Sequence, residues 1–398
     1  MWNICKEAQE NFLKCNLLPI HESDHDWEIA LRGGKEEKDA LFTYLKEQLA
    51  RVKGELLHTL PNRFIPYLEN GTLNQPTLPK AVREDYLQWM LEARKEFEQT
   101  LDAAYKQKKQ AVPFLSTAVQ DVFAGGLHDS TIERVERDGN TLHLYINTDG
   151  GFSSKSLIHL IFKGITSEEM DKPIQVGQWF VYDELQKTDD EFAFRVLFEG
   201  PYSQWTITMK ELEAQYFYHP KEYILLRNDR KLEQTPVTEY ISRLNSEFDY
   251  WLITPHIECA IQLVSENIVI ENGSIEYGQN EMIVTVDNKH FTYNLNEYNP
   301  IKFIYTDVYE DPYAHQKVHV PKEEIELAAL SDDLELQVRA WNTMHANPKE
   351  LASIINRVLS KTVITEKNEM MLTVYTRYFY KNEVLIEENI EKYRTLID

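Results

Sequence analysis

Two histidine-containing segments carry the side chains best suited to metal chemistry. His128 and Asp129 come just before two alternating segments, which contain His143 and His159. Imidazole and carboxylate groups are ligands for zinc or for a harder metal ion. The alternation, however, places His143 on a polar face and His159 on the apolar side of its segment, so we expect no shared metal site. We expect instead a polar site in which Asp129 accepts hydrogen bonds from backbone amides and His128 packs beside it.

A second group of candidate side chains lies in residues 307–319, which combine carboxylates, tyrosines and histidines. The residues are Asp307, Tyr309, Glu310, Asp311, Tyr313, His315 and His319. Carboxylates beside histidines can act as metal ligands or as general acids and bases. Pro312 and Pro321 favour an extended loop, to which the helical spacing of a zinc-binding histidine pair does not apply. The segment is therefore either a solvated acidic loop or a contact site, in which its tyrosines and carboxylates would bind a protein partner.

The chain is strongly acidic, with 42 basic and 65 acidic residues and a formal net charge of −23. Between Arg243 and Lys289 there is no lysine or arginine, but there are eight acidic residues. These are Glu247, Asp249, Glu258, Glu266, Glu271, Glu276, Glu281 and Asp287. Such a field repels phosphate backbones and acidic membranes, so we expect neither direct nucleic-acid binding nor membrane binding. It attracts a basic protein, which we expect Glu266, Glu271 and Glu276 to contact. Acidity that serves only solubility is the alternative interpretation.

Common catalytic and cofactor-binding motifs are missing from the sequence. It has no Gly-x-x-x-x-Gly-Lys-Ser/Thr nucleotide loop, no Gly-x-Gly-x-x-Gly, no Gly-x-Ser-x-Gly and no His-Glu-x-x-His. Cys5, Cys15 and Cys259 form no Cys-x-x-Cys pair, which argues against a zinc ribbon or a disulfide framework. The sequence has no apolar run of 18 residues and no signal-peptide pattern at its start. We therefore expect a cytoplasmic protein without a cofactor.

The elements that must position these residues begin with helices. Apolar residues follow the helical repeat over residues 35–57, and a second, longer stripe covers residues 79–109. We expect residues 1–122 to form a helical layer. This layer should pack on a sheet formed by residues 123–220 and make up the first domain with it.

Alternation and turn signals predict an antiparallel meander over residues 131–200. Leu142, Leu144 and Ile146 lie on one side of the clearest strand, and the preceding Asp138-Gly139-Asn140 supplies a turn. Residues 208–218 begin with the spacing of a capping box, which predicts a short helix after the meander.

A second α+β domain is predicted over residues 235–398, after a boundary at 219–237 that contains prolines. Its predicted elements are a helix at 237–251, a meander over 267–295, a strand at 301–305, a helix at 347–360, a strand at 370–380 and a helix at 383–396. The predicted fold class is therefore α+β, with a helical layer on an antiparallel meander followed by a second α+β unit.

The order of these segments resembles an uncharacterised bacterial family that is defined only as a domain of unknown function. The resemblance covers about residues 1–220. It rests on the helical start, on Leu-His-Asp-Ser-x-Ile at 127–132, on the Gly-Gly-Phe strand at 150–162 and on the segments 179–184 and 192–198. The Leu-His-Asp-Ser-x-Ile opening is also similar to immunity-protein-like families, which neutralise toxins of rival bacteria. Neither resemblance implies a catalytic residue.

Acidity, the missing motifs and these resemblances together predict a non-catalytic protein-binding factor. Its role would be that of an inhibitor, immunity-type or anti-defence protein that neutralises a toxin or a nucleic-acid-processing complex. The alternative is an enzyme, either a metal-dependent hydrolase or a nucleotidyl enzyme, which would use His128 and Asp129 or the segment 307–319.

Overall fold

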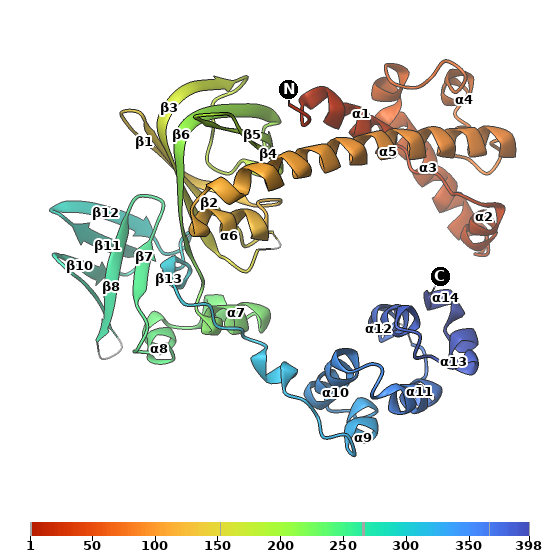
Figure 1. The fold of residues 1–398 in the computed structure, drawn as a ribbon. Coiled ribbons are helices and arrows are strands. Elements are labelled where there is room, and N and C mark those ends of the chain that lie inside the picture. Colours follow the sequence, from red (N-terminus) through yellow and green to blue (C-terminus); the bar gives the residue numbers. More distant parts are fainter. Residues whose placement is uncertain (1, 152, 265–266, 366, 398) are drawn as a thin grey trace. The chain divides into compact units, whose positions relative to one another are not determined.

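The computed structural model describes residues 2–397, apart from residues 152, 265–266 and 366 and the side chains of residues 14–15. Glu266 and the side chain of Cys15 therefore lie outside the described part. Helices and strands form an α+β fold, as predicted. Close contacts divide the chain into two compact units (Figure 1). Unit 1 comprises Met1–His219 and Asn245–Val308, and unit 2 comprises Pro220–Leu244 and Tyr309–Asp398.

Unit 1 begins with helices, and its two longest helices confirm the predicted ones. They are α1 (Lys6–Asn16), α2 (Asp24–Ala30), α3 (Lys35–Leu57), α4 (Ile65–Glu69), α5 (Lys80–Ala111), the short η1 (Val112–Phe114) and α6 (Thr117–Gly125). Leu49 and Leu56 of α3 share a buried cluster with Tyr86 of α5. Farther along α5, Phe97 packs edge-on against Tyr182 of the following sheet, with ring centroids 5.3 Å apart. The helix α5 therefore connects the helical layer to the sheet.

The sheet of unit 1 is a closed barrel with the strand order β1-β2-β3-β6-β5-β4. Its strands are β1 (Thr131–Asp138), β2 (Thr141–Asn147), β3 (Leu157–Met170), β4 (Trp179–Lys187), β5 (Phe192–Glu199) and β6 (Ser203–Phe217). The first five strands confirm the predicted strands, but the predicted meander over residues 131–200 is only partly right. β1, β2 and β3 are consecutive neighbours, whereas β3 pairs with β6, and β4 pairs with β5 and β1. The predicted helix at 208–218 is wrong, because this segment belongs to β6, which pairs with both β3 and β5. Ile207, Met209 and Leu212 of β6 are buried in the barrel core, and this burial outweighs the local capping signal.

Two smaller sheets complete unit 1. One has the order β13-β7-β8-β9 and the other β10-β11-β12. The strands are β7 (Tyr250–Ile253), β8 (Glu258–Val264), β9 (Asn267–Ile270), β10 (Gly273–Tyr277), β11 (Glu281–Val286), β12 (Lys289–Asn294) and β13 (Ile304–Thr306), which follows η3 (Pro300–Phe303). They confirm the strands predicted within 267–295, but only β10, β11 and β12 form a meander, because β9 pairs with β8 in the other sheet. The predicted helix at 237–251 is only partly right, because its last residues begin β7 and only α8 (Val237–Ser242) is helical.

Residues 245–308 pack with the barrel, although the sequence grouped them with residues 309–398. Tyr218 and Thr306 exchange two backbone hydrogen bonds of 2.8 and 2.9 Å, which fasten β13 to the end of β6. Tyr145 and Leu157 on the outside of the barrel are buried with Ile253 and Tyr305 from the four-stranded sheet. The outer face of the barrel and the four-stranded sheet therefore form a second, smaller hydrophobic core between them.

Unit 2 is helical among its described residues. Its elements are α7 (Lys221–Asn228), η2 (Leu232–Gln234), α8, η4 (Ala314–Lys317), α9 (Ile325–Ala329), α10 (Leu334–Ala346), α11 (Ala352–Lys361), α12 (Glu369–Lys381), α13 (Glu387–Lys392) and α14 (Arg394–Ile397). The predicted strand at 370–380 is wrong, because α12 buries Leu372, Thr376 and Phe379 at helical spacing. The predicted helix at 383–396 is divided into α13 and α14, and the one at 347–360 begins later, at Ala352. None of the helices described for either unit is long and apolar enough to cross a membrane.

Candidate functional site

A buried arginine lies on the outer face of the barrel, where the strands β1 and β2 meet the four-stranded sheet. Arg134 of β1 is only 6% exposed, and its guanidinium carbon lies 3.6 Å from the ring centroid of Tyr145, its partner in the β1–β2 register. A register shift between Ile132 and Arg134 interrupts the alternation of β1. Because of this bulge, Ile132 points into the barrel core while Arg134 points outward.

Two carboxylates flank this guanidinium. Glu136 Oε1 lies 3.4 Å from Arg134 Nε, and Glu258 Oε2 of β8 lies 3.8 Å from Arg134 Nη2. Glu258 Oε2 also lies 3.9 Å from Nδ1 of His159 on β3. These separations exceed ordinary hydrogen bonds, and both Arg134 Nε and His159 Nδ1 are buried with no hydrogen-bond partner among the described residues. Arg134 and the two glutamates are thus close enough to attract one another by charge, but some of their hydrogen-bonding atoms have no partner among the described residues.

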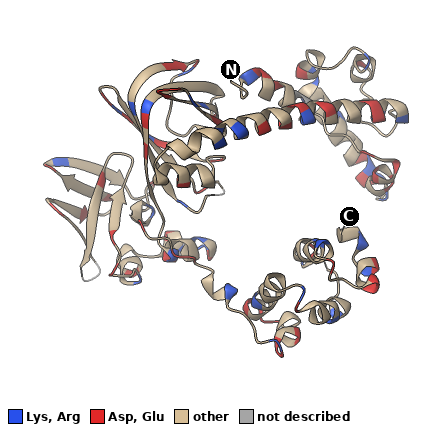
Figure 2. Ribbon diagram, viewed as in Figure 1, with Lys and Arg blue, Asp and Glu red and all other residues tan. Residues whose placement is uncertain are grey.

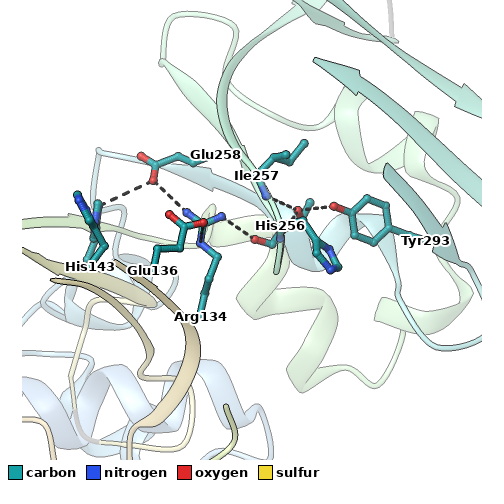
Figure 3. A network of polar contacts seen from close by, with 9 residues as sticks. Arg134, Glu136, His143, His256, Ile257, Glu258 and Tyr293 are labelled. Carbon is teal, nitrogen blue, oxygen red and sulfur yellow. Dashed lines mark hydrogen bonds and ion pairs between the residues drawn. The ribbon is translucent and has the colours of Figure 1, made fainter. Parts of the chain in front are cut away.

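The other end of Arg134 is held by the turn between β7 and β8. Arg134 Nη1 donates to the carbonyl oxygen of Thr254 at 3.3 Å. The hydroxyl of Thr254 accepts from the amides of His256 and Ile257 at 3.2 and 3.1 Å, and it lies 2.6 Å from the hydroxyl of Tyr293 on β12 (Figure 3). This network joins the barrel to both smaller sheets.

Two histidines lie on the same outer face, next to the arginine. His143 Nδ1 and His159 Nε2 are 2.9 Å apart. Burial, followed by the neighbouring His143 and Arg134, lowers the pKa of His159 to about 3, so this imidazole is neutral at ordinary pH. The expectation that these histidines face opposite sides is wrong, because Tyr145 pairs with His159 across β2 and β3. Both faces of β3 are buried over residues 157–162, so an apolar neighbour such as Leu157 does not identify the inner face.

A pocket of about 420 Å³ opens beside Arg134. It is lined by Arg134, Glu136, Tyr145, Trp251, His256, Ile257, Glu258, Cys259 and Ala260. Burial raises the pKa of the Cys259 thiol to about 11, and Glu258 adds to this effect, so the thiol remains protonated and is a poor nucleophile. Burial, followed by Glu258, also raises the pKa of the Tyr145 phenol. The pocket can thus bind through charge, hydrogen bonds and aromatic surface.

His128 and Asp129 lie apart from this pair of histidines. Their side chains are 53% and 47% exposed, with His128 Nδ1 3.6 Å from Asp129 Oδ1. The ring of His128 stacks on Tyr182, with centroids 5.9 Å apart. The structure therefore brings His143 and His159 together without His128. Among the described residues, no group of three or more histidines, cysteines or carboxylates is placed to hold a metal ion.

The segment 307–319 begins at the end of unit 1 and continues into unit 2. Asp307 is exposed at the end of β13. In unit 2, Glu310 lies 3.2 Å from Lys221, and Asp311 lies 2.5 Å from Lys317, which lowers the pKa of the Asp311 carboxyl. The Tyr313 hydroxyl contacts the side-chain amide of Asn228, and the rings of Tyr309 and Tyr313 are exposed. Lysines thus partly neutralise two of the predicted contact residues.

The predicted acidic contact residues Glu271 and Glu276 are exposed near the β9–β10 turn and on β10, whereas Glu266 lies outside the described residues. The sequence did not indicate Arg134, Glu136 or Trp251 as site residues. The spacing of Arg134 and Glu136, two positions apart in a short strand, is the local feature that could have indicated that both lie on one face. For Glu258 the sequence shows only its charge, because its partner Arg134 is more than a hundred residues away in the chain.

Comparison with other proteins gives one match. Residues 4–209 match the family described as a protein of unknown function, DUF4085. No curated protein and no solved structure matches the chain. The matched residues extend from the segment before α1 into β6, and residues 210–398 lie outside the match.

Proposed function

The chain belongs to the DUF4085 family, whose description names no activity, and from the chain's own residues we propose that it is a non-catalytic protein-binding factor. Its partner is a protein with a basic surface. The role is that of an inhibitor, of the immunity or anti-defence type, which occupies a toxin or a nucleic-acid-processing complex in the cytoplasm. A protein of this kind needs a surface that attracts its target from a distance and holds it through fixed contacts.

The observation that carries this proposal is the charge on residues 245–288 of unit 1. The strands β7 to β11 contain no lysine or arginine (Figure 2). Six carboxylates of this region are exposed, and none forms an ion pair with another described residue: Glu247, Asp249, Glu271, Glu276, Glu281 and Asp287. Unpaired charges of one sign produce a long-range field, which accelerates association with an oppositely charged protein.

The experiment begins with capture of the partner from the native cell and its purification. Association rates are then measured at several salt concentrations for the wild-type chain and for a variant with Glu271→Gln, Glu276→Gln and Glu281→Gln. We expect the wild-type rate to fall as salt rises, because exposed charges are screened over about 8 Å at physiological ionic strength. The variant should associate more slowly at low salt.

The matched control removes three exposed carboxylates from the helices α3 and α5, through Glu47→Gln, Glu96→Gln and Glu98→Gln. It changes the net charge equally but leaves residues 245–288 intact. An association rate that does not change with salt concentration would contradict the proposal. So would an equal decrease of this rate in both variants. The metal content of the pure protein, measured alongside, tests the enzyme alternative directly.

A further inference from the structure

The pocket beside Arg134 has the composition of a binding site for a second guanidinium. Two carboxylates, Glu136 and Glu258, face one buried guanidinium, and Arg134 is the only lysine or arginine among the described residues that line the pocket. The neighbouring His159 is uncharged, so it does not balance the second carboxylate. We propose that an arginine side chain of the basic partner inserts into this pocket, an inference that rests on the proposed function.

The two carboxylates are placed to accept a ligand from solvent. Glu136 comes from the barrel strand β1 and is 50% exposed, while Glu258 comes from β8 and is 22% exposed. Figure 3 shows both beside Arg134, on separate strands. Their distances of 3.4 and 3.8 Å from Arg134 leave oxygen lone pairs available. A guest guanidinium can therefore bridge their outer oxygens while the inner oxygens face Arg134.

Arg134 is a second, independent sign of an incomplete site. Its side chain is more than nine-tenths buried and lines the pocket, yet its Nε has no hydrogen-bond partner among the described residues. The hydrogen bond to the Thr254 carbonyl and the contact with the Tyr145 ring fix the position of the Arg134 side chain. A guest cation at the outer oxygens would balance the second carboxylate, which Arg134 alone does not balance.

The aromatic wall of the pocket favours arginine over lysine. Trp251 lines the pocket, and its ring is fixed against Phe217 with centroids 5.3 Å apart. A planar guanidinium stacks on an indole and binds carboxylates through several parallel donors, whereas an ammonium is compact and strongly hydrated. The volume of about 420 Å³ leaves room for the side chain and part of the partner's backbone.

The test uses the full chain and small probes that carry the side chain without the partner. Calorimetric titration with Nα-acetyl-arginine amide is compared with Nα-acetyl-citrulline amide, which has nearly the same shape but no charge. We expect the arginine probe to bind at least about tenfold more tightly than citrulline and more tightly than Nα-acetyl-lysine amide. Glu136→Gln should weaken binding of the arginine probe by about tenfold, and Glu98→Gln, at an exposed position of α5, should leave its binding unchanged.

Equal binding of arginine and citrulline probes, or an unchanged affinity in a folded Glu136→Gln variant, overturns the inference. Glu136 is chosen because it is half exposed, so its replacement should preserve the fold, and a melting curve verifies this. The proposed function fails in a different way. In that case the arginine probe still binds to the pocket. The association rate with the captured partner, however, changes neither with salt concentration nor when Glu271 and Glu276 are replaced.

Discussion

Nδ1 of His143 and Nε2 of His159 lie 2.9 Å apart on the outer face of the barrel, with Arg134 close by. One nitrogen must donate and the other accept, so the pair is stable only while at most one proton lies between them. Protonation of both rings would place two further positive charges beside a buried guanidinium. The junction between the barrel and the four-stranded sheet therefore depends on a neutral imidazole at His159.

The first prediction is a loss of stability in acid. The pKa of His159 is lowered to about 3 in the folded chain, whereas an unfolded histidine has a pKa of about 6.5. Between these values the unfolded state binds more protons. The contribution of neutral His159 to the free energy of unfolding should therefore be fully present above pH 6.5. It should decrease as the pH falls toward 3, by at most about 1.4 kcal/mol per pH unit. Denaturant unfolding at several pH values measures this slope.

His159→Gln should reduce the slope, because glutamine has no proton to gain. His58→Gln serves as the control, since His58 is exposed at the end of α3. Parallel pH profiles for wild type and His159→Gln would show that another group is responsible.

The second prediction concerns Arg134 as the link between sheets. Arg134→Ala leaves Glu136 and Glu258 without their shared cation and removes the contact with Tyr145. We expect a loss of about 2 kcal/mol in the free energy of unfolding, because the substitution removes a buried hydrogen bond from a charged group to Thr254 and the contact with the Tyr145 ring. Hydrogen exchange should accelerate first in β7 and β8. Arg137→Ala, an exposed arginine of the same strand, should have a much smaller effect.

The third prediction concerns Glu184 of β4, which is fully buried. Its carboxylate accepts from the amides of Asn3 and Ile4 at 2.9 and 2.8 Å and from the side chain of Asn3 at 2.9 Å. Glu184→Ala should destabilise unit 1 by about 3 kcal/mol, since several donors lose their acceptor. Faster hydrogen exchange at the amide of Ile4 is the specific readout. If Ile4 stayed protected, other contacts would hold the N-terminal segment. Glu199→Ala, at the exposed end of β5, is the control.

The fourth prediction tests the segment 307–319 as a contact site. Tyr309 and Tyr313 are exposed in unit 2, where they offer aromatic area beside carboxylates. Replacing both by alanine should weaken binding of the captured partner by more than about 1 kcal/mol. The melting temperature should change little. Tyr105→Ala on α5, which removes another exposed tyrosine, should leave affinity unchanged. An unaltered affinity of the double variant would move the contact elsewhere.

The barrel strands could be predicted where one side of a strand faces the core and turn residues separate it from the next. Leu142, Leu144 and Ile146 alternate cleanly and lie in the barrel core as expected. The strand β6 could not be predicted in the same way, because a local capping pattern at 208–211 coincides with a strand whose pairing partners are distant in sequence. The prediction of a strand at 370–380 is wrong for a related reason. Its aromatic residues favour a strand locally, but packing at helical spacing decides the outcome.

The candidate site was harder to predict than the fold. A bulge turns Arg134 outward, and simple alternation from Ile132 would have placed it in the core. His143 and His159 meet because the outer face of the barrel is itself covered by residues 245–308, which no local pattern reveals. The acidic run was visible from composition alone, since charge does not depend on the register of any strand.

The match to the family ends at residue 209, in the middle of β6, which continues to Phe217. A gene fragment cut at that limit would encode five strands and half of the sixth. Residues 211–217 pair with Leu157 to Lys163 of β3, so the truncated product would expose this edge and the barrel interior to solvent. A sound expression boundary lies beyond Phe217, and one that also keeps the outer face covered must include residues 245–308. The segment shared with relatives is thus shorter than the segment that has to fold together.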